Sequence, residues 1–239
     1  MYGLGTVINT LAILVGGLFG AMFGKLLSDS AQDTLTKICG VSTLFIAVSG
    51  ALEGMLRVEN GVIVSSGSML IVISLAVGAV IGEAMRIEDA FENFGEWLKQ
   101  KTGNAKDKGF VDAFVTASLT VCIGAMAIVG SIEDGLTGDF SILATKAVLD
   151  LIIIMVMTCP LGRGAVFSAI PVAVFQGSIT ALAGLVRPIM TDAALSNLSL
   201  VGNVLIFCVG VNLLWDKRIR VANLLPAVLI AVIAAFLPL

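Results

Sequence analysis

Apolar segments, each about as long as a bilayer is thick, alternate with short polar stretches along this chain. A helix needs roughly 20 mostly apolar residues to cross the hydrocarbon core. We therefore expect an all-α, polytopic membrane protein of about eight transmembrane helices, forming one transmembrane domain over residues 1–239. The expected spans are 4–24, 38–56, 68–85, 110–130, 141–160, 165–186, 198–215 and 221–238.

Composition agrees with a membrane location and disfavours several functions. The chain is 58% hydrophobic and 13% charged, against roughly 45–50% and 25% in soluble domains. A net charge of −3 provides no basic field for nucleic acid. With no histidine, the chain lacks the usual proton shuttle and imidazole metal ligand. The cysteines form no C-x-x-C pair. We therefore expect no enzyme, no cofactor, no metal and no nucleic-acid partner.

Three apolar segments resemble one another at regular spacing, which predicts internal repeats. They begin at Val41, Val121 and Val201 and carry a glycine near their ends, at Gly50, Gly130 and Gly210. Together with the glycine-rich helices that precede them, they predict helix-hairpin units at about 9–55, 71–135 and 165–214. The similarity of the third unit to the first is weak before Val201.

The basic residues predict the orientation of the chain, because lysine and arginine in short loops stay on the cytoplasmic side. If the N-terminus is outside, eight spans leave only Arg57 and Arg187 on the outer side, and Lys146 inside a span. We expect a multi-pass protein of the bacterial inner membrane with both termini outside. The third unit is then inverted relative to the first two, as in many secondary transporters. The inner basic residues are Lys25, Lys37, Arg86, Lys99, Lys101, Lys106, Lys108, Arg163, Lys217, Arg218 and Arg220.

Glycines spaced four apart create flat helix faces that let another backbone approach. We expect such packing at Gly16, Gly20 and Gly24, at Gly78 and Gly82, and at the repeated Gly50, Gly130 and Gly210. A backbone-lined permeation path is the alternative use of these faces. The same faces favour association into a homo-oligomer, with a dimer as the favoured form.

Residues 86–101 predict an amphipathic helix lying in the headgroup plane. Ile87, Ala90, Phe91, Phe94 and Leu98 recur at helical spacing, and the charges lie on the other face. The alternative is that this helix docks on a partner subunit.

Asp150 and Lys146 lie inside the fifth expected span, four residues apart and so on one helix face. A charge in the bilayer costs roughly 2.5–3.5 kcal/mol, so such a group is a functional candidate. Asp150 is expected to carry or gate an ion, with Lys146 as its counter-charge. A buried pair that only fixes helix register is the alternative.

Further polar residues suggest an acidic outer mouth. Glu53 and Glu133 follow the repeated glycines, Asp134 comes next, and Asn212 takes the corresponding place in the third unit. Neighbouring carboxylates would attract cations, although an ordinary solvated loop explains them equally. Asn9, Asn203 and Gln176 are explained by interhelical hydrogen bonds.

Gly162, Arg163 and Gly164 form a tight turn after Pro160. An anion cradle is the alternative to a plain cytoplasmic turn. The sequence contains no nucleotide-binding motif, so we do not expect an ATP-driven pump.

Several motifs resemble the bacterial membrane family named domain of unknown function 554. They are Gly5-Thr6-Val7-Ile8-Asn9, the Gly16-Gly17 and Gly20 run, the stretch from Gly130 to Gly135, and Lys146 to Asp150. The resemblance covers essentially the whole chain and implies a polytopic inner-membrane protein, at most a transporter, of no stated substrate. From the residues we expect a transporter or channel that lies in the lipid bilayer and carries an ion or a small solute. A cation is favoured over an anion. A scaffold or sensor that recruits a partner through 87–101 is the alternative.

Overall fold

The computed structural model describes residues 2–59, 61–215 and 219–237. Lys217 and Arg218, which enter the topology prediction, and position 238 of the last expected span lie outside the described residues. The helices of the first half are α1 (Leu4–Gly24), α2 (Asp29–Met55), α3 (Ser68–Met85), α4 (Ile87–Lys101), α5 (Phe110–Cys122) and α6 (Ala125–Thr137). The second half has α7 (Ser141–Leu161), η1 (Arg163–Ser168), α8 (Ala169–Ala181), α9 (Ala183–Val186), α10 (Asp192–Leu214), η2 (Val221–Leu224) and α11 (Pro226–Ala234).

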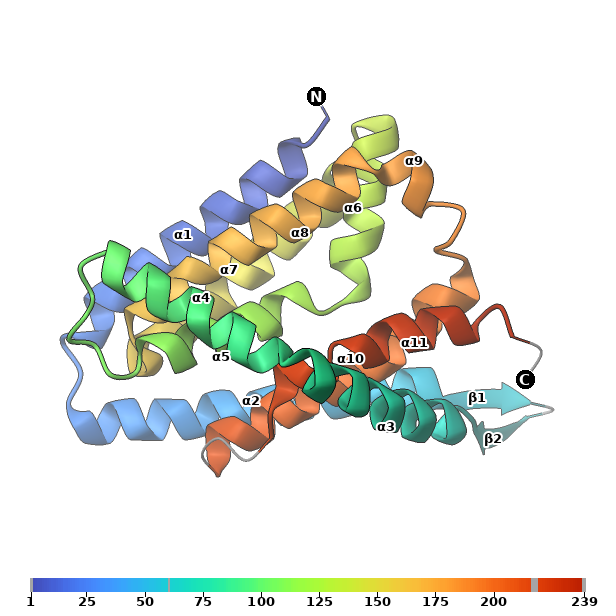
Figure 1. The fold of residues 1–239 in the computed structure, drawn as a ribbon, viewed down its shortest axis with the longest axis horizontal. Coiled ribbons are helices and arrows are strands. Elements are labelled where there is room, and N and C mark those ends of the chain that lie inside the picture. Colours follow the sequence, from blue (N-terminus) through green and yellow to red (C-terminus); the bar gives the residue numbers. More distant parts are fainter. Residues whose placement is uncertain (1, 60, 216–218, 238–239) are drawn as a thin grey trace. The chain divides into compact units, whose positions relative to one another are not determined.

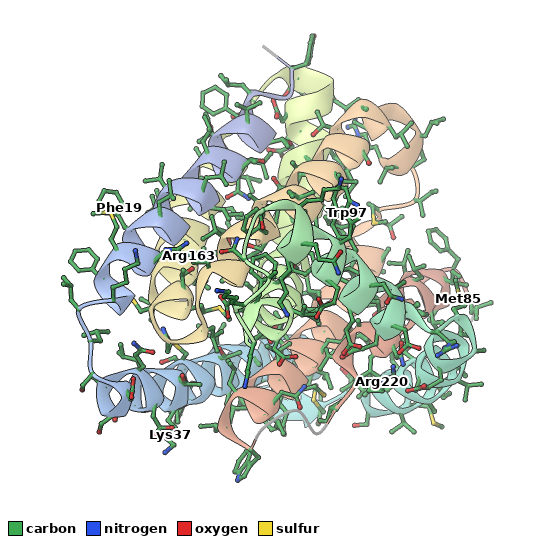
Figure 2. All side chains as sticks on the ribbon, turned by 60° about the vertical axis from the view of Figure 1, so that its left-hand side comes forward. Phe19, Lys37, Met85, Trp97, Arg163 and Arg220 are labelled. Carbon is green, nitrogen blue, oxygen red and sulfur yellow. The ribbon has the colours of Figure 1, made fainter. Side chains whose placement is uncertain are left out.

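The described helices confirm an all-α, polytopic membrane protein. Six helical segments are long and apolar enough to cross a bilayer: α1, α2, α3, α7, α10, and η1 joined to α8. The count is seven if the bent pair α5–α6 is one span; η2 and α11 form a shorter apolar stretch. Large apolar side chains point outward from these helices, as Phe19 on α1 and Met85 on α3 do in Figure 2. An outward apolar surface of this kind is suited to lipid rather than to water.

The chain divides into two compact units. Unit 1 comprises the described parts of Met1–Cys39, Ala90–Cys122 and Met126–Arg187, and unit 2 those of Gly40–Asp89, Ile123–Ala125 and Pro188–Leu239.

In unit 1, α1 and α7 lie side by side and run in the same direction (Figure 1). A Cβ atom on Gly16 or Gly20 would overlap the backbone carbonyl oxygens of Leu151 or Met155. Only glycine therefore permits this approach. In lipid, helix association depends on such close packing because no hydrophobic force drives apolar helices together.

The bent pair α5–α6 connects the two ends of unit 1. At the start of α5, the backbone of Phe110 contacts Gly164 in η1. At the far end of α6, Gly135 contacts Thr180 near the end of α8, and Asp134 binds the start of α1. The pair therefore reaches from one end of unit 1 to the other.

Unit 2 contains antiparallel helix pairs. On α3, Gly78 and Gly82 lie against Ala227 of α11 and Asn223 of η2. Gly50 of α2 meets the side chain of Asn203 on α10. A two-stranded hairpin, β1 (Leu56–Glu59) with β2 (Val62–Ser65), follows α2.

Three expectations need correction. An uninterrupted helix over 110–130 is wrong, because α5 and α6 meet at 64° around Gly124, whose φ of 156° suits a residue without a side chain. The helix expected at 38–56 begins at Asp29, nine residues earlier, and so includes most of the polar stretch between the first two expected spans. The β-hairpin at 56–65 was not predicted from the sequence.

The expected boundaries hold at 4–24 and 68–85, where α1 and α3 begin and end, and α4 begins one residue after the start of the expected helix 86–101. The third repeat unit, expected at 165–214, contains most of η1 and all of α8, α9 and α10. Its inversion, like the interfacial placement of α4, stays a prediction.

Candidate functional site

The two charges expected inside the fifth span form an ion pair on α7. The Lys146 Nζ atom lies 2.8 Å from the Asp150 carboxylate. Their side chains are 11% and 3% exposed, so hardly any of either charge reaches the surface of the protein. The pairing follows from helix geometry, because residues four apart lie on one face.

A third residue, Asn9 on α1, joins this pair. Its Nδ2 atom donates a hydrogen bond of 3.0 Å to Asp150 Oδ2. Its Oδ1 atom is buried without a hydrogen-bond partner in the part of the chain that the structure describes. The close α1–α7 contact brings Asn9 to Asp150. The cluster thus contains a carboxylate, an ammonium group and a free amide oxygen.

The end of α5 lies near this cluster. Both Lys146 and Asp150 are within electrostatic reach of the Cys122 thiol, and Cys122 is the last residue of α5 before the break. The buried charges and the residue at which α5 ends therefore belong to the same unit, unit 1. In membrane transporters, interrupted helices commonly line the binding site.

Asp134 has a structural partner that the sequence did not reveal. It lies within α6, is fully buried, and accepts hydrogen bonds from the backbone N–H groups of Gly3 and Gly5, at 3.1 and 3.0 Å. The expected loop after Gly130 is therefore wrong, because α6 continues to Thr137. Asp134 caps α1 instead of lining an acidic mouth.

The other candidates are exposed or serve local roles. Glu133 is exposed on α6. Glu53 is exposed on α2 in unit 2. Asn212, also in unit 2, joins the end of α10 to the following loop: its Nδ2 donates to the Ile219 carbonyl oxygen at 2.7 Å, and its Oδ1 accepts from Ile219 N at 2.9 Å.

A second buried amide belongs to unit 1. Gln176 on α8 is 1% exposed, and neither polar atom of its amide has a hydrogen-bond partner among the described residues. Near the end of α8, the hydroxyl of Thr180 lies 3.4 Å from that of Thr6 on α1. In the sequence, Asn9 and Gln176 stand out only as amides inside apolar helices. From the sequence alone we explained both by hydrogen bonding between helices.

No metal centre is built into the described ranges: no three or more cysteine, aspartate or glutamate side chains gather there. The Asp150 cluster offers oxygen atoms from only two residues.

A family model described as "Protein of unknown function (DUF554)" matches residues 4–236. "Uncharacterized membrane protein YdfK" of Bacillus subtilis is 27% identical over 232 residues, which cover 97% of this chain and 95% of that protein. "Uncharacterized protein YqgA" of Escherichia coli is 28% identical over 232 residues, 95% of this chain and 94% of that protein. No solved structure matches the chain.

Proposed function

The chain belongs to the family described as "Protein of unknown function (DUF554)", and from this membership and the buried cluster of unit 1 we propose that it is a cation transporter or channel, not driven by ATP. The observation that carries the proposal is the Lys146, Asp150 and Asn9 cluster beside the end of α5. The bacterial relatives favour the cytoplasmic membrane as its location.

The cost of the cluster supports a function. Two charges at bilayer depth cost roughly 2.5–3.5 kcal/mol each before pairing. Replacing a buried ion pair by apolar residues of similar volume is often neutral or stabilising. Helix register alone is therefore a weak reason to keep Lys146 and Asp150 inside the membrane.

The chemistry of the cluster favours a cation. The Asp150 carboxylate and the unpartnered Asn9 Oδ1 offer oxygen atoms from two different helices. Oxygen ligands suit hard cations. In the resting state the Lys146 ammonium group occupies the carboxylate, so an arriving cation or proton must displace it.

The broken span supplies the access that such an exchange needs. Non-helical backbone at membrane depth is tolerated where it is buried in protein or lines a water-filled cavity. α5 ends at Cys122, and the charges of Lys146 and Asp150 are within electrostatic reach of its thiol. A small change at the break would alter access to Asp150.

Ion flux into proteoliposomes tests the proposal. The purified chain is assayed with Na⁺, K⁺, H⁺, divalent cations and small organic acids. Asp150→Asn should lower cation flux at least about tenfold, because the site loses the charge that compensates for dehydration of the ion. The matched control is Asp33→Asn, which removes the same i to i+4 pairing from the exposed Lys37–Asp33 bridge on α2 and should leave flux unchanged.

A double variant separates transport from folding. Lys146→Met with Asp150→Leu replaces both charges by apolar side chains, which should preserve stability. Under the proposal this protein folds but does not transport. Normal flux in the double variant, or no flux of any solute through the unmodified protein, would contradict a transport role for the pair.

A scaffold or sensor is the second candidate, and α4 favours it. Phe94 and Trp97 stack with ring centroids 5.8 Å apart and are 39% and 52% exposed. On the same helix, Leu98 is buried and Gly95 packs near Phe114. This candidate would replace the first if no solute moved and removal of α4 abolished the cellular phenotype.

A further inference from the structure

An open pocket of about 520 Å³ lies in unit 1, away from the Asp150 cluster. Its walls are the ends of α1 and α7, the loop 103–107, and the start of η1. The lining side chains include three cations, Lys25, Lys106 and Arg163, and a single carboxylate, Asp107. The pocket is therefore net positive.

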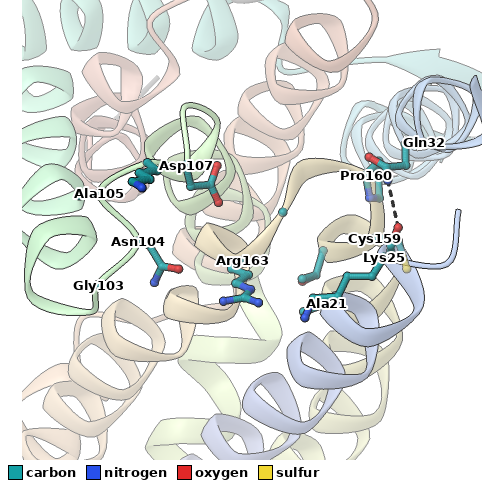
Figure 3. Close-up of a pocket in the computed structure, with 14 residues that line it drawn as sticks. Ala21, Lys25, Gln32, Gly103, Asn104, Ala105, Asp107, Cys159, Pro160 and Arg163 are labelled. Carbon is teal, nitrogen blue, oxygen red and sulfur yellow. Dashed lines mark hydrogen bonds between the residues drawn. The ribbon is translucent and has the colours of Figure 1, made fainter. Parts of the chain in front are cut away.

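Among the described residues, these cations have no partners of their own. In the described ranges, none of Lys25, Lys106 and Arg163 forms an ion pair or a side-chain hydrogen bond. Figure 3 shows the Arg163 guanidinium between the Lys25 side chain and the loop residues Asn104 and Asp107. Three unpaired cations in one concave site repel one another, and an anion between them would relieve that repulsion.

Unit 2 contains a contrasting arginine at a similar position. Arg163 begins η1, and Arg220 immediately precedes η2. The guanidinium of Arg220 is paired with Glu83 and with Asp89. Asp89 is also held by Arg86 at 2.7 Å, and these bonds keep its pKa below the usual range. The chain thus neutralises one such arginine internally but leaves Arg163 to face a pocket.

The loop wall of the pocket is held in place by its own hydrogen bonds. The Asn104 side chain donates to Thr102 at 2.9 Å, and Asp107 Oδ1 accepts from Gly109 N at 3.1 Å. On the other side, Gln32 Nε2 donates to the Gly24 carbonyl oxygen at 3.0 Å, shown as a dashed line in Figure 3. Walls that are ordered beforehand reduce the entropy cost of binding.

We propose that this pocket binds a phosphate-bearing anion, with Arg163, Lys25 and Lys106 as its cationic ligands. Arginine recognises phosphate through its planar fork, and lysine does so as a point charge. The pocket lies where α1 and α7 end, on the side that the basic residues predict to be cytoplasmic. Basic pockets at such a level hold the head groups of anionic lipids, and a free phosphate compound offers the same chemistry. The proposal does not depend on cation transport.

Thermal unfolding of the full chain, followed by tryptophan fluorescence, tests the site in two arms. In the first, protein in phosphatidylcholine nanodiscs is titrated with inorganic phosphate, against chloride at equal ionic strength. In the second, phosphatidylcholine nanodiscs are compared with nanodiscs containing phosphatidylglycerol. We expect a higher Tm with phosphate, with phosphatidylglycerol, or with both.

Variants assign the effect to the pocket. Arg163→Gln should weaken phosphate binding roughly tenfold, because a charge-assisted hydrogen bond is lost. Lys25→Gln, at an exposed position, provides the same test if Arg163→Gln fails to fold. Lys37→Gln is the control, since Lys37 is paired with Asp33 outside the pocket.

The pattern of shifts identifies the source of the anion. A shift in the phosphate arm alone indicates a soluble compound, and a shift in the lipid arm alone indicates a head group. No shift in either arm overturns the proposal, as do equal shifts in the unmodified protein and both pocket variants. Because neither arm measures flux, a failure here leaves the transport proposal untouched.

Discussion

At the start of α1, two backbone N–H groups point at one carboxylate, since Gly3 and Gly5 both donate to Asp134. The first N–H groups of a helix have no partner within the helix, and in hydrocarbon water does not supply one. We predict that Asp134→Ala lowers the free energy of unfolding by about 1–2 kcal/mol, the range seen for lost helix caps. Thermal unfolding in detergent measures this loss.

The adjacent carboxylate provides the control. Glu133 is exposed, so Glu133→Ala should leave the unfolding temperature within error. Equal losses in both variants would show that the acidic character of α6, and not the cap, is what stabilises α1. The comparison matters because the two residues are indistinguishable in the sequence.

Sequence spacing was sufficient for one part of the candidate site and insufficient for the other. Lys146 and Asp150 are four residues apart on a single helix, so local geometry alone predicts their contact. Asp134 meets N–H groups 129 and 131 residues away, and Asn9 reaches Asp150 across 141 residues. Contacts of that range depend on which helices pack together, and a single sequence does not contain that information.

Among the elements, the α1–α7 contact depends most directly on missing side chains. Gly20 faces the backbone of Met155 and the side chain of Thr158. We predict that Gly20→Leu separates the two helices and destabilises the protein by about 1–3 kcal/mol or more, as overpacking does. The same change moves Asn9 away from Asp150, so cation flux should fall as well.

A helical glycine without neighbours is the matched control. Gly177, on α8, has no atom within 4 Å of the position that a Cβ would take. Gly177→Leu should therefore leave both the unfolding temperature and flux unchanged. A similar loss in the two variants would mean that any leucine at a glycine in these helices is harmful, whatever it meets.

The elements that sequence predicts well are those whose ends coincide with a change in polarity. α1 and α3 are uniform apolar segments between polar residues, and their boundaries match the expectation. In the sequence, α5 and α6 form one continuous apolar segment. Gly124 separates the two helices, but other glycines of this chain lie inside unbroken helices, so a glycine alone does not indicate a break. The sequence does contain an indication of the hairpin, because Asn60-Gly61 between alternating apolar residues favours a tight turn.

At the scale of the whole molecule, the contacts within each unit agree with an alternating path across the membrane. In unit 1, Gly5 meets Leu143 near the beginnings of α1 and α7, and Gly24 meets Cys159 near their ends. In unit 2, Gly67, before α3, meets Leu200, and Asn197 binds the Ala231 carbonyl oxygen near the end of α11. Within each unit, helix ends that are expected on the same side of the membrane are therefore in contact with one another.

The bent pair α5–α6 is the step on which this path depends most. If it crosses the membrane, the positions before α5 and after α6 lie on opposite sides. We predict that, in a chain whose four cysteines are replaced by alanine, Thr137→Cys reacts with a membrane-impermeant maleimide on intact spheroplasts. Lys108→Cys should react only after the membrane is permeabilised, because the lysines of loop 102–109 favour the cytoplasm.

The two positions separate crossing from orientation. Both are exposed on the protein, so a failure to react reports the membrane and not burial. If both react on intact spheroplasts, or neither does, the pair returns to the side where it began, and every later span is reversed. If only Lys108→Cys reacts, the pair still crosses but the chain is oriented the other way, with Arg163 and Lys25 outside. A soluble phosphate compound of the cytoplasm could not then reach the pocket they line, whereas an outer-leaflet head group could.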